Sequence, residues 1–469
     1  MKKILVVGFA LLASALNAAW KYDPDAKTLT DGVLIFNATL ANDNELSIDA
    51  TDGRFVGDSV PETFSIDFTT ISDTDDKQYV VVKFGDFSHV NGNYFKAYAD
   101  RLTEFIAPDC KNIFGNGCFS ECSQMTKVEV NKDISFSNDR PFYKCSKLSD
   151  FTPRTMLMTS LRTEFFYGCS SLSGEFNLPN CTTIATKAFS GCSSLEKVSM
   201  PKVTAISGNA FASCASLQEV VVSDSLDKIG STAFSGCTSL RGDSIRSLLH
   251  PGITMLGTSN GDIKTIFENC SSFDGSLEWD FLNITTYEYK GVSYPINLVG
   301  EGFFSGCSKL EKVVFKTPVL EIRNSAFKEI APGAEVYLHK EVAEVYGKQA
   351  VARATAPFPK VFLPDPIEPW LQTMGVSNFL LEKKDFRNTS WEKKINASDS
   401  TKTGYWKDIA AMMMTDAAMC GKETIDGTDY PVPLDKRIVA FVYFTNSSTR
   451  GNGCWVLRMS KNGFTIKVR

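Results

Sequence analysis

Histidine is scarce in this chain of 469 residues, which has three, and none follows His339. A histidine-activated nucleophile therefore cannot be built around Cys420 or Cys454 from their own part of the sequence. The Gly-x-Ser-x-Gly, His-Glu-x-x-His, phosphate-loop and dinucleotide patterns are absent as well. Only catalysis by paired carboxylates stays open, because Asp and Glu are abundant. We predict a protein that is not an enzyme and that holds neither cofactor nor metal.

A surplus of positive charge is also missing. Lys and Arg number 49 against 54 Asp and Glu, a net charge of −5, so binding to nucleic acid has no electrostatic support. After residue 18 no run of about 20 apolar residues occurs, and no transmembrane segment is expected. Residues 1–18 combine Lys2, Lys3, an apolar stretch and a final small Ala18, which is typical of a secretory signal peptide. A short buried N-terminal strand is the alternative.

What the chain does have is one short sequence motif, aromatic-x-x-Cys-x-x-apolar, that occurs eight times. Its cysteines are Cys122, Cys145, Cys169, Cys192, Cys214, Cys237, Cys270 and Cys307. The first five spacings between them are 22–24 residues, and the last two are 33 and 37. A period near 23 is the length of one turn of a leucine-rich solenoid. Stacked turns bury the apolar face that a single turn cannot bury alone.

The regular spacing predicts a ladder of reduced, buried thiols rather than disulfides. Free cysteine behaves as a small hydrophobic residue. Parallel stacking also points neighbouring thiols in the same direction, which is poor geometry for a bond between them. Outside the ladder stand Cys110, Cys118, Cys181, Cys420 and Cys454. Of these, Cys420 and Cys454 are the best candidates for a disulfide.

A short strand follows each cysteine. After Cys192, the apolar Leu195, Val198 and Met200 alternate with polar residues, so one face of the strand is buried. The outward positions are candidate binding residues, and a merely solvated face is the alternative. They are Lys127, Glu129, Glu175, Asn177, Lys197, Ser199, Glu219 and Lys312.

The repeat resembles the BspA-type leucine-rich repeat family, whose pattern is A-F-x-x-C-x-x-L-x-x-V-x-h-P followed by an Ile-Gly pair. Ile229-Gly230 matches that pair, and Ile206-Ser207-Gly208 departs from it by one residue. The resemblance covers roughly residues 102–364. It implies a secreted or surface-exposed repeat protein of the kind linked with adhesion or host-protein binding.

The predicted fold is therefore a mainly β solenoid of the α/β type, with about ten turns of 22–24 residues. The expected divisions are a signal peptide (1–18), an N-terminal β-rich capping domain (19–100), the solenoid (101–364), a proline-rich linker (365–370) and a small C-terminal α+β domain (371–469). An independent binding module is the alternative for the N-terminal domain. The C-terminal domain should hold a helix at 406–420 and strands at 437–444, 454–459 and 464–468.

Two insertions, at 248–262 and 285–302, should form loops on one face of the array. The second carries Tyr287, Tyr289 and Tyr294, candidate loop residues for stacking on a sugar or anchoring a protein.

Three other segments have a functional interpretation and a plainer one. Arg241-Gly242-Asp243 is a tripeptide that integrins recognise, but Gly242 also stands where Gly174 and Gly275 stand in their own repeats. The acidic segments 49–52 and 72–76 offer oxygen ligands for Ca²⁺, without the spacing of a known calcium loop. Solvated turns, including one at Asp52-Gly53, are the plainer interpretation of both.

These patterns together predict an exported, non-catalytic repeat protein that binds a protein or glycan partner at a cell surface. It should be secreted or held at that surface, with the periplasm as an alternative location. Two other functions stay open. One is a structural envelope or matrix protein that assembles through its terminal domains, and the other is a carbohydrate-binding accessory protein.

Overall fold

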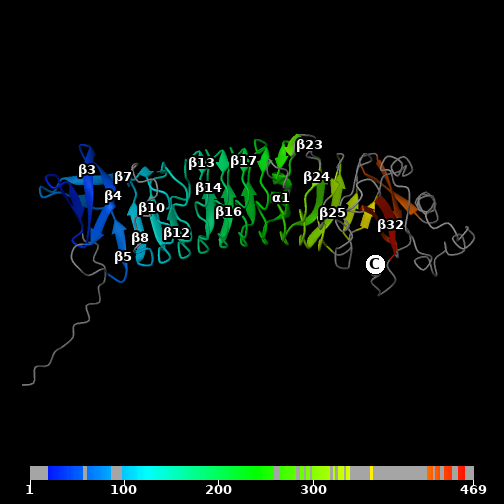
Figure 1. Cartoon of the computed structure of the whole chain (residues 1–469), viewed down its shortest axis with the longest axis horizontal. Helices are drawn as coiled ribbons and strands as arrows, with labels where there is room; N and C mark the ends of the chain where they lie inside the picture. The colour runs from blue at the N-terminus through cyan, green and yellow to red at the C-terminus, as the bar shows by residue number, and fades with distance from the viewer. Residues whose placement is uncertain are drawn as a thin grey trace, which may run out of the picture. The chain divides into compact units, whose positions relative to one another are not determined.

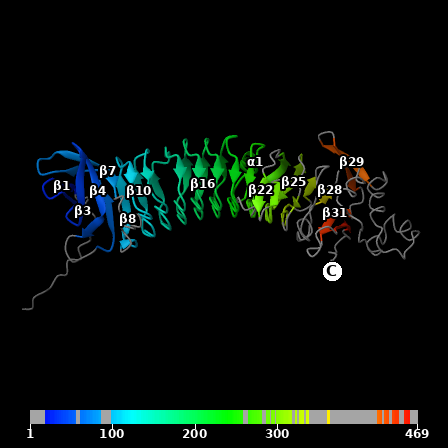
Figure 2. The ribbon, with the colours of Figure 1, turned by 45° about the horizontal axis from the view of Figure 1, so that its top comes forward.

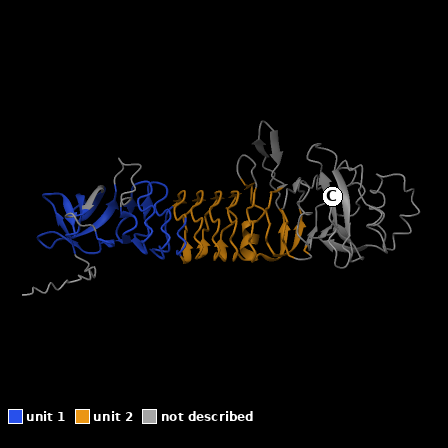
Figure 3. Ribbon diagram, turned by 60° about the horizontal axis from the view of Figure 1, so that its bottom comes forward, with its two compact units in different colours: residues 1–158, 168–172 blue, residues 159–167, 173–469 orange. Residues whose placement is uncertain are grey.

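The computed structural model is almost entirely β (Figure 1). It describes residues 19–55, 61–85, 98–257, 264–280, 286–289, 292–295, 298–316, 321–322, 326–331, 334–337, 360–362, 420–425, 428–433, 438–445 and 453–459. The chain divides into two compact units (Figure 3). Unit 1 comprises residues 1–158 and 168–172, and unit 2 comprises 159–167 and 173–469.

Unit 1 begins with a small closed barrel. Its strands are β1 (Trp20–Asp23), β2 (Thr28–Thr30), β3 (Leu34–Asn42), β4 (Glu45–Phe55), β6 (Ile71–Ser72) and β7 (Gln78–Phe84). Strands β1 to β4 pair in order, β4 pairs with β7, β7 with β6, and β6 with β1, which closes the ring. Trp20 fills the interior, with its ring 5.8 Å from that of Phe36 and 4.9 Å from that of Phe68. The turn predicted at Asp52-Gly53 is wrong, because both residues lie within β4.

Two parallel sheets follow in unit 1. The long-strand sheet contains β5 (Phe64–Asp67), β8 (Leu102–Ala107), β10 (Lys127–Val130) and β12 (Asp150–Thr152). The short-strand sheet runs from β7 through β9 (Asn112–Ile113) to β11 (Ser135–Phe136). Strand β7 therefore belongs both to the barrel and to the short-strand sheet. The rings of Phe84 and Phe119 stack at 6.2 Å, so the barrel and the repeats of this unit share one core.

Unit 2 repeats the arrangement of long and short strands (Figures 1 and 2). Its first long-strand sheet contains β14 (Gly174–Asn177), β16 (Leu195–Ser199) and β18 (Glu219–Val221). Its second contains β21 (Asp274–Trp279), β25 (Lys309–Phe315), β27 (Glu335–Tyr337) and β28 (Lys360–Phe362). The short strands are β13 (Ser160–Leu161), β15 (Thr183–Ile184), β17 (Ala205–Ile206), β19 (Lys228–Ile229) and β20 (Met255–Leu256), with β24 (Leu298–Val299) paired to β26 (Glu321–Ile322).

The recurring phenylalanines of unit 2 form a stacked column. The ring of Phe211 lies 5.3 Å from those of both Phe189 and Phe234, and Phe234 lies 5.6 Å from Phe267. The rings are nearly parallel, tilted by 12°, 4° and 5°. All four side chains are fully buried. Stacking is thus the direct result of placing one aromatic residue at the same point of each turn.

The ladder thiols connect each turn to the one before it. From Cys145 onward, each ladder Sγ lies 3.0–3.3 Å from the carbonyl oxygen of the preceding turn's phenylalanine, so that Cys214, for example, donates to Phe189. The same carbonyl accepts the backbone N–H of its own turn's cysteine, as Phe211 does from Cys214, which uses both lone pairs. All eight ladder cysteines are free and buried. Burial raises the pKa of the Cys122 and Cys237 thiols to about 12.

Helix α1 (Gly242–Leu248) stands where the repeat would place a long strand. In the turn of β14, Phe176 and Leu178 point inward. The matching positions after Leu240 are Ser244 and Arg246, with Ile245 between them. A strand would bury Arg246 as well as Ser244 and would expose Ile245, whereas the helix buries Ser244, Ile245 and Leu248 and leaves Arg246 partly exposed. Within the insertion predicted as a loop at 248–262, Leu248 is the last residue of this helix and Met255–Leu256 form β20, so the loop prediction is wrong at both places.

Within the described residues of the C-terminal region, 420–459, the strands form two antiparallel pairs. They are β29 (Cys420–Ile425) with β30 (Thr428–Pro433), and β31 (Ile438–Thr445) with β32 (Gly453–Met459). The last pair lies where strands were predicted at 437–444 and 454–459. Cys420 begins β29 instead of ending the predicted helix, so that boundary was wrong. Residues 1–18, the linker, positions 406–419, the strand at 464–468 and the side chains of Cys420 and Cys454 lie outside the described residues.

Candidate binding face

The outward side chains of the long strands form what we call the strand face of each unit. In unit 1, Lys127 on β10 lies in register with Glu104 on β8 and Asp150 on β12. Its Nζ is 3.3 Å from Oε2 of Glu129, two residues along the same strand. The hydrogen bond with Glu129, together with the charges of Glu129, Asp150 and Glu104, raises the pKa of Lys127. The lysine therefore stays charged among three carboxylates.

Unit 2 repeats the alternation of charge. Glu175, Lys197 and Glu219 lie in one register row across β14, β16 and β18, and Lys197 Nζ is 3.2 Å from Glu219 Oε1. Asn177 and Ser199 lie in the next row. Neighbouring parallel strands are about 4.8 Å apart, so the row presents groups of fixed sign at fixed spacing.

The second long-strand sheet of unit 2 carries Lys312, in register between Ser276 and Glu335. Lys316 Nζ lies 2.6 Å from Glu278 Oε2 on the same sheet. Every predicted strand-face residue thus lies on a long strand and is at least partly exposed.

Helix α1 separates the two long-strand sheets of unit 2 and satisfies the strand edges on both sides. Ser244 Oγ accepts the N–H of Val220 on β18 at 3.1 Å. Arg246 donates to the carbonyl oxygens of Asp274 and Ser276 on β21, each at 3.0 Å. Side chains of the helix thereby replace hydrogen bonds that a strand would have made.

The strand faces, with their rows of exposed side chains at fixed spacing, suit recognition by an extended surface. The residues that the structure describes contain no group of three or more His, Cys, Asp or Glu side chains placed to hold a metal ion. Over that same part of the chain, no helix has both the length and the apolar character needed to cross a membrane.

The repeats match a known family. The family model described as "BspA type Leucine rich repeat region (6 copies)" matches residues 88–202, 159–259 and 264–350. The chain belongs to the BspA-type leucine-rich repeat family. Leucine-rich repeat proteins are in general non-catalytic and bind other proteins.

Solved structures with similar folds are leucine-rich repeat proteins of bacteria. A leucine-rich repeat protein of Bacteroides ovatus is 18% identical over 66% of this chain and 76% of its own, with a TM-score of 0.43. A leucine-rich cell surface protein of Faecalibacterium prausnitzii is 20% identical over 73% and 96%, with a TM-score of 0.38. A leucine-rich repeat protein of T. pallidum is 23% identical over 45% of this chain and 91% of its own, with a TM-score of 0.34. No curated protein matches the chain.

The Arg-Gly-Asp segment of this BspA-type chain is accounted for by packing around α1. Arg241 donates to Gln218 Oε1 at 2.6 Å, and Asp243 Oδ1 lies 2.7 Å from Arg246. A Cβ on the buried Gly242 would lie 2.9 Å from the carbonyl oxygen of Asp274. Sequence comparison equated Gly242 with Gly174 and Gly275, but only those two have positive φ, at 79° and 72°. Gly242 is needed for space and not for a left-handed backbone.

The three tyrosines of the second insertion lie in a hairpin rather than a loop. Tyr287 and Tyr289 are in β22 (Thr286–Tyr289), and Tyr294 is in β23 (Val292–Pro295). Tyr287 is directly opposite Tyr294 in the antiparallel register. Their side chains lie outside the described residues.

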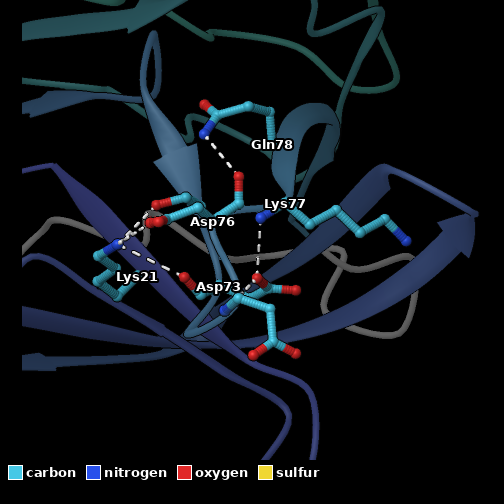
Figure 4. Close-up of polar contacts among 7 residues, drawn as sticks. Lys21, Asp73, Asp76, Lys77 and Gln78 are labelled. Atoms are coloured by element: carbon cyan, nitrogen blue, oxygen red, sulfur yellow. Dashed lines mark hydrogen bonds and ion pairs between the residues drawn. The ribbon is translucent and has the colours of Figure 1, made fainter.

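The acidic segment at 72–76 forms a polar network in the barrel (Figure 4). Asp73 Oδ1 accepts the N–H groups of Asp75 and Lys77, and its Oδ2 accepts the hydroxyl of Tyr79 at 2.8 Å. Lys21 donates to Ser72 Oγ at 2.7 Å. The Tyr79 hydrogen bond lowers the pKa of Asp73, while burial and Asp73 raise the pKa of Tyr79 to about 12. Asp73 therefore holds the β6–β7 turn together.

Proposed function

We propose that this protein is exported, does not catalyse a reaction, and binds a protein or glycan partner at a cell surface through its strand face. Membership of the BspA-type family supports a role in interaction. The observation that carries the proposal is the row of Glu175, Lys197 and Glu219, whose side chains are held in register on paired strands. Such a surface is ordered before the partner arrives, which lowers the entropy cost of association.

A charge-reversal series on the full-length protein tests the strand face. Reversing the charges of Glu175, Lys197 and Glu219 together should abolish the retention of the protein on cells or on extracellular matrix. The control is Lys228→Glu, which changes an exposed charge on the short strand β19. Equal retention by the triple variant and wild type would contradict the proposal.

Export is tested separately. The chain is expressed with and without residues 1–18, and each form is followed by fractionation and N-terminal sequencing. Only the form made with residues 1–18 should be found outside the cytoplasm, and its sequence should begin after Ala18. Cytoplasmic recovery of the uncleaved complete chain would remove the cell-surface part of the proposal.

A further inference from the structure

The row of alternating charge on the strand face of unit 2 is complementary to itself. Glu175, Lys197 and Glu219 lie in register on β14, β16 and β18, and Figure 1 shows β14 and β16 side by side. Phe176 and Val198, the next residues along two of these strands, are buried. Alternation along each strand therefore directs the charged side chains outward, about 4.8 Å from strand to strand.

The two acids of the row differ in their surroundings within the chain. Glu219 Oε1 is 3.2 Å from Lys197 Nζ. Glu175 is exposed, and none of the described residues forms a hydrogen bond or an ion pair with its carboxylate. An ammonium group has three hydrogens to donate, so Lys197 can bind a second carboxylate besides that of Glu219. The row thus contains an acid without a cation and a cation with donors to spare.

A second copy of the chain supplies what each of these groups lacks. The two strand faces would meet about a two-fold axis that runs parallel to the strands, midway between β14 and β16. Rotation about this axis reverses the order of the strands, so that Glu175 of each copy lies opposite Lys197 of the other. Sheets packed face to face are about 10 Å apart, a gap that one lysine and one glutamate side chain bridge together.

The same rotation brings no like charges together in the next row. Asn177 and Ser199 are in register on the same two strands, so Asn177 of each copy lies opposite Ser199 of the other. Both side chains are short and uncharged, and each has a donor and an acceptor. They can bond to each other directly or through a water molecule. Both rows are therefore compatible with the one arrangement.

We propose that the strand face of unit 2 binds the strand face of a second copy of this chain, through reciprocal pairs of Glu175 and Lys197. The inference rests on the function proposed above and names the protein partner. Exposed ion pairs contribute little individually, so one such contact is weak. Many copies on each of two opposing surfaces engage together, and their avidity holds the surfaces to each other.

The test places full-length protein, biotinylated at its C-terminus, on streptavidin beads and measures bead aggregation by light scattering. Wild-type beads should aggregate, and high salt should weaken the aggregation. Glu175→Lys places lysine opposite lysine, and Lys197→Glu places glutamate opposite glutamate, so each should slow aggregation about 10-fold. Beads of the two variants, mixed in two colours, should aggregate with each other as wild-type beads do, because each reciprocal pair is again attractive. General attraction does not explain this result, since both variants keep a negative net charge in a chain that begins at −5.

The matched control is Glu196→Lys, which makes the same change of net charge on β16 at an exposed position outside the row. Its beads should aggregate within about 2-fold of the wild-type rate, and circular dichroism shows that each variant is folded.

Four results would each overturn the self-association: no aggregation of wild-type beads, undiminished aggregation of either single variant, no aggregation of the mixture, or equal slowing by Glu196→Lys. If wild-type protein is then still retained on cells, this inference alone fails. Aggregation of beads without retention on cells would instead contradict the function proposed above.

Discussion

Cysteine at the repeat position combines small size, an apolar character that tolerates full burial, and a hydrogen that can be donated. Alanine has no donor, and serine has a hydroxyl that is costly to remove from water. In the structure the sulfur occupies the core while its hydrogen is directed at the phenylalanine carbonyl of the preceding turn. The repeated cysteine therefore has both a packing and a hydrogen-bonding role.

Replacing one such cysteine should show the size of this effect. Cys214→Ala removes the sulfur contacts and the bond to Phe189, and it should lower the free energy of unfolding by about 1–2 kcal/mol. Urea unfolding followed by circular dichroism measures the change. Glu196→Ala on the exposed side of β16 is the control, expected within about 0.5 kcal/mol of wild type. A neutral Cys214→Ala would show that the thiol contributes nothing to stability.

The Asp73 network predicts a pH effect in the barrel. Because the folded pKa of Asp73 is lowered, its stabilising contribution is present above the unfolded pKa of about 3.9 and is lost as the pH falls through the folded value. Tyr79→Phe removes the main cause of that lowering. Acid unfolding of the barrel should then begin at higher pH, seen by hydrogen exchange of peptides from residues 19–85. An unshifted acid transition would mean that the Tyr79 hydrogen bond is not what protects Asp73.

At the scale of elements, the substitution Gly242→Ala in α1 has two opposing effects on stability. Alanine is a better helix former than glycine by about 1 kcal/mol, so Gly242→Ala would be stabilising on propensity alone. The added Cβ, however, would lie 2.9 Å from the backbone oxygen of Asp274, which cannot move without disturbing β21. We expect the clash to dominate and to lower the free energy of unfolding by about 1–3 kcal/mol. Thermal unfolding measures it, with Ser247→Ala on the exposed side of the helix as control.

The long strands could be predicted because each alternates apolar and polar residues, as Val198 and Ser199 do. The helix could also have been found, since Ser244 and Arg246 occupy inward positions and Ile245 an outward one. It was missed because Gly242 was matched to Gly174 by repeat position alone. The closure of the barrel through β6 could not be predicted, because it depends on pairing between β1 and a strand of two residues about fifty positions away.

The strand face was predictable residue by residue, because outward positions follow from the alternation. The Asp73–Tyr79 hydrogen bond was not, because it depends on the left-handed backbone of Asp76 in the turn between β6 and β7. Spacing in the sequence does not report such a backbone.

For the whole molecule, the buried thiols predict loss of stability at high pH. Their pKa values are raised on folding, to about 12 for Cys122 and Cys237, so above about pH 9 the unfolded chain holds fewer protons than the folded one. Each such thiol lowers the free energy of unfolding by about 1.4 kcal/mol per pH unit in that window. Urea midpoints should fall steeply between about pH 8.5 and 10.5, and iodoacetamide should label the ladder only after unfolding. A flat midpoint, or labelling of the folded protein, would contradict this.

The direction of the sulfur hydrogen bonds has a consequence for how the chain is assembled. In each of the seven ladder bonds the carbonyl acceptor comes earlier in the sequence and the thiol donor comes later. A polypeptide made from its amino end would thus have each acceptor in place before the matching donor appears, so that every new coil can dock on a finished one as it leaves the ribosome.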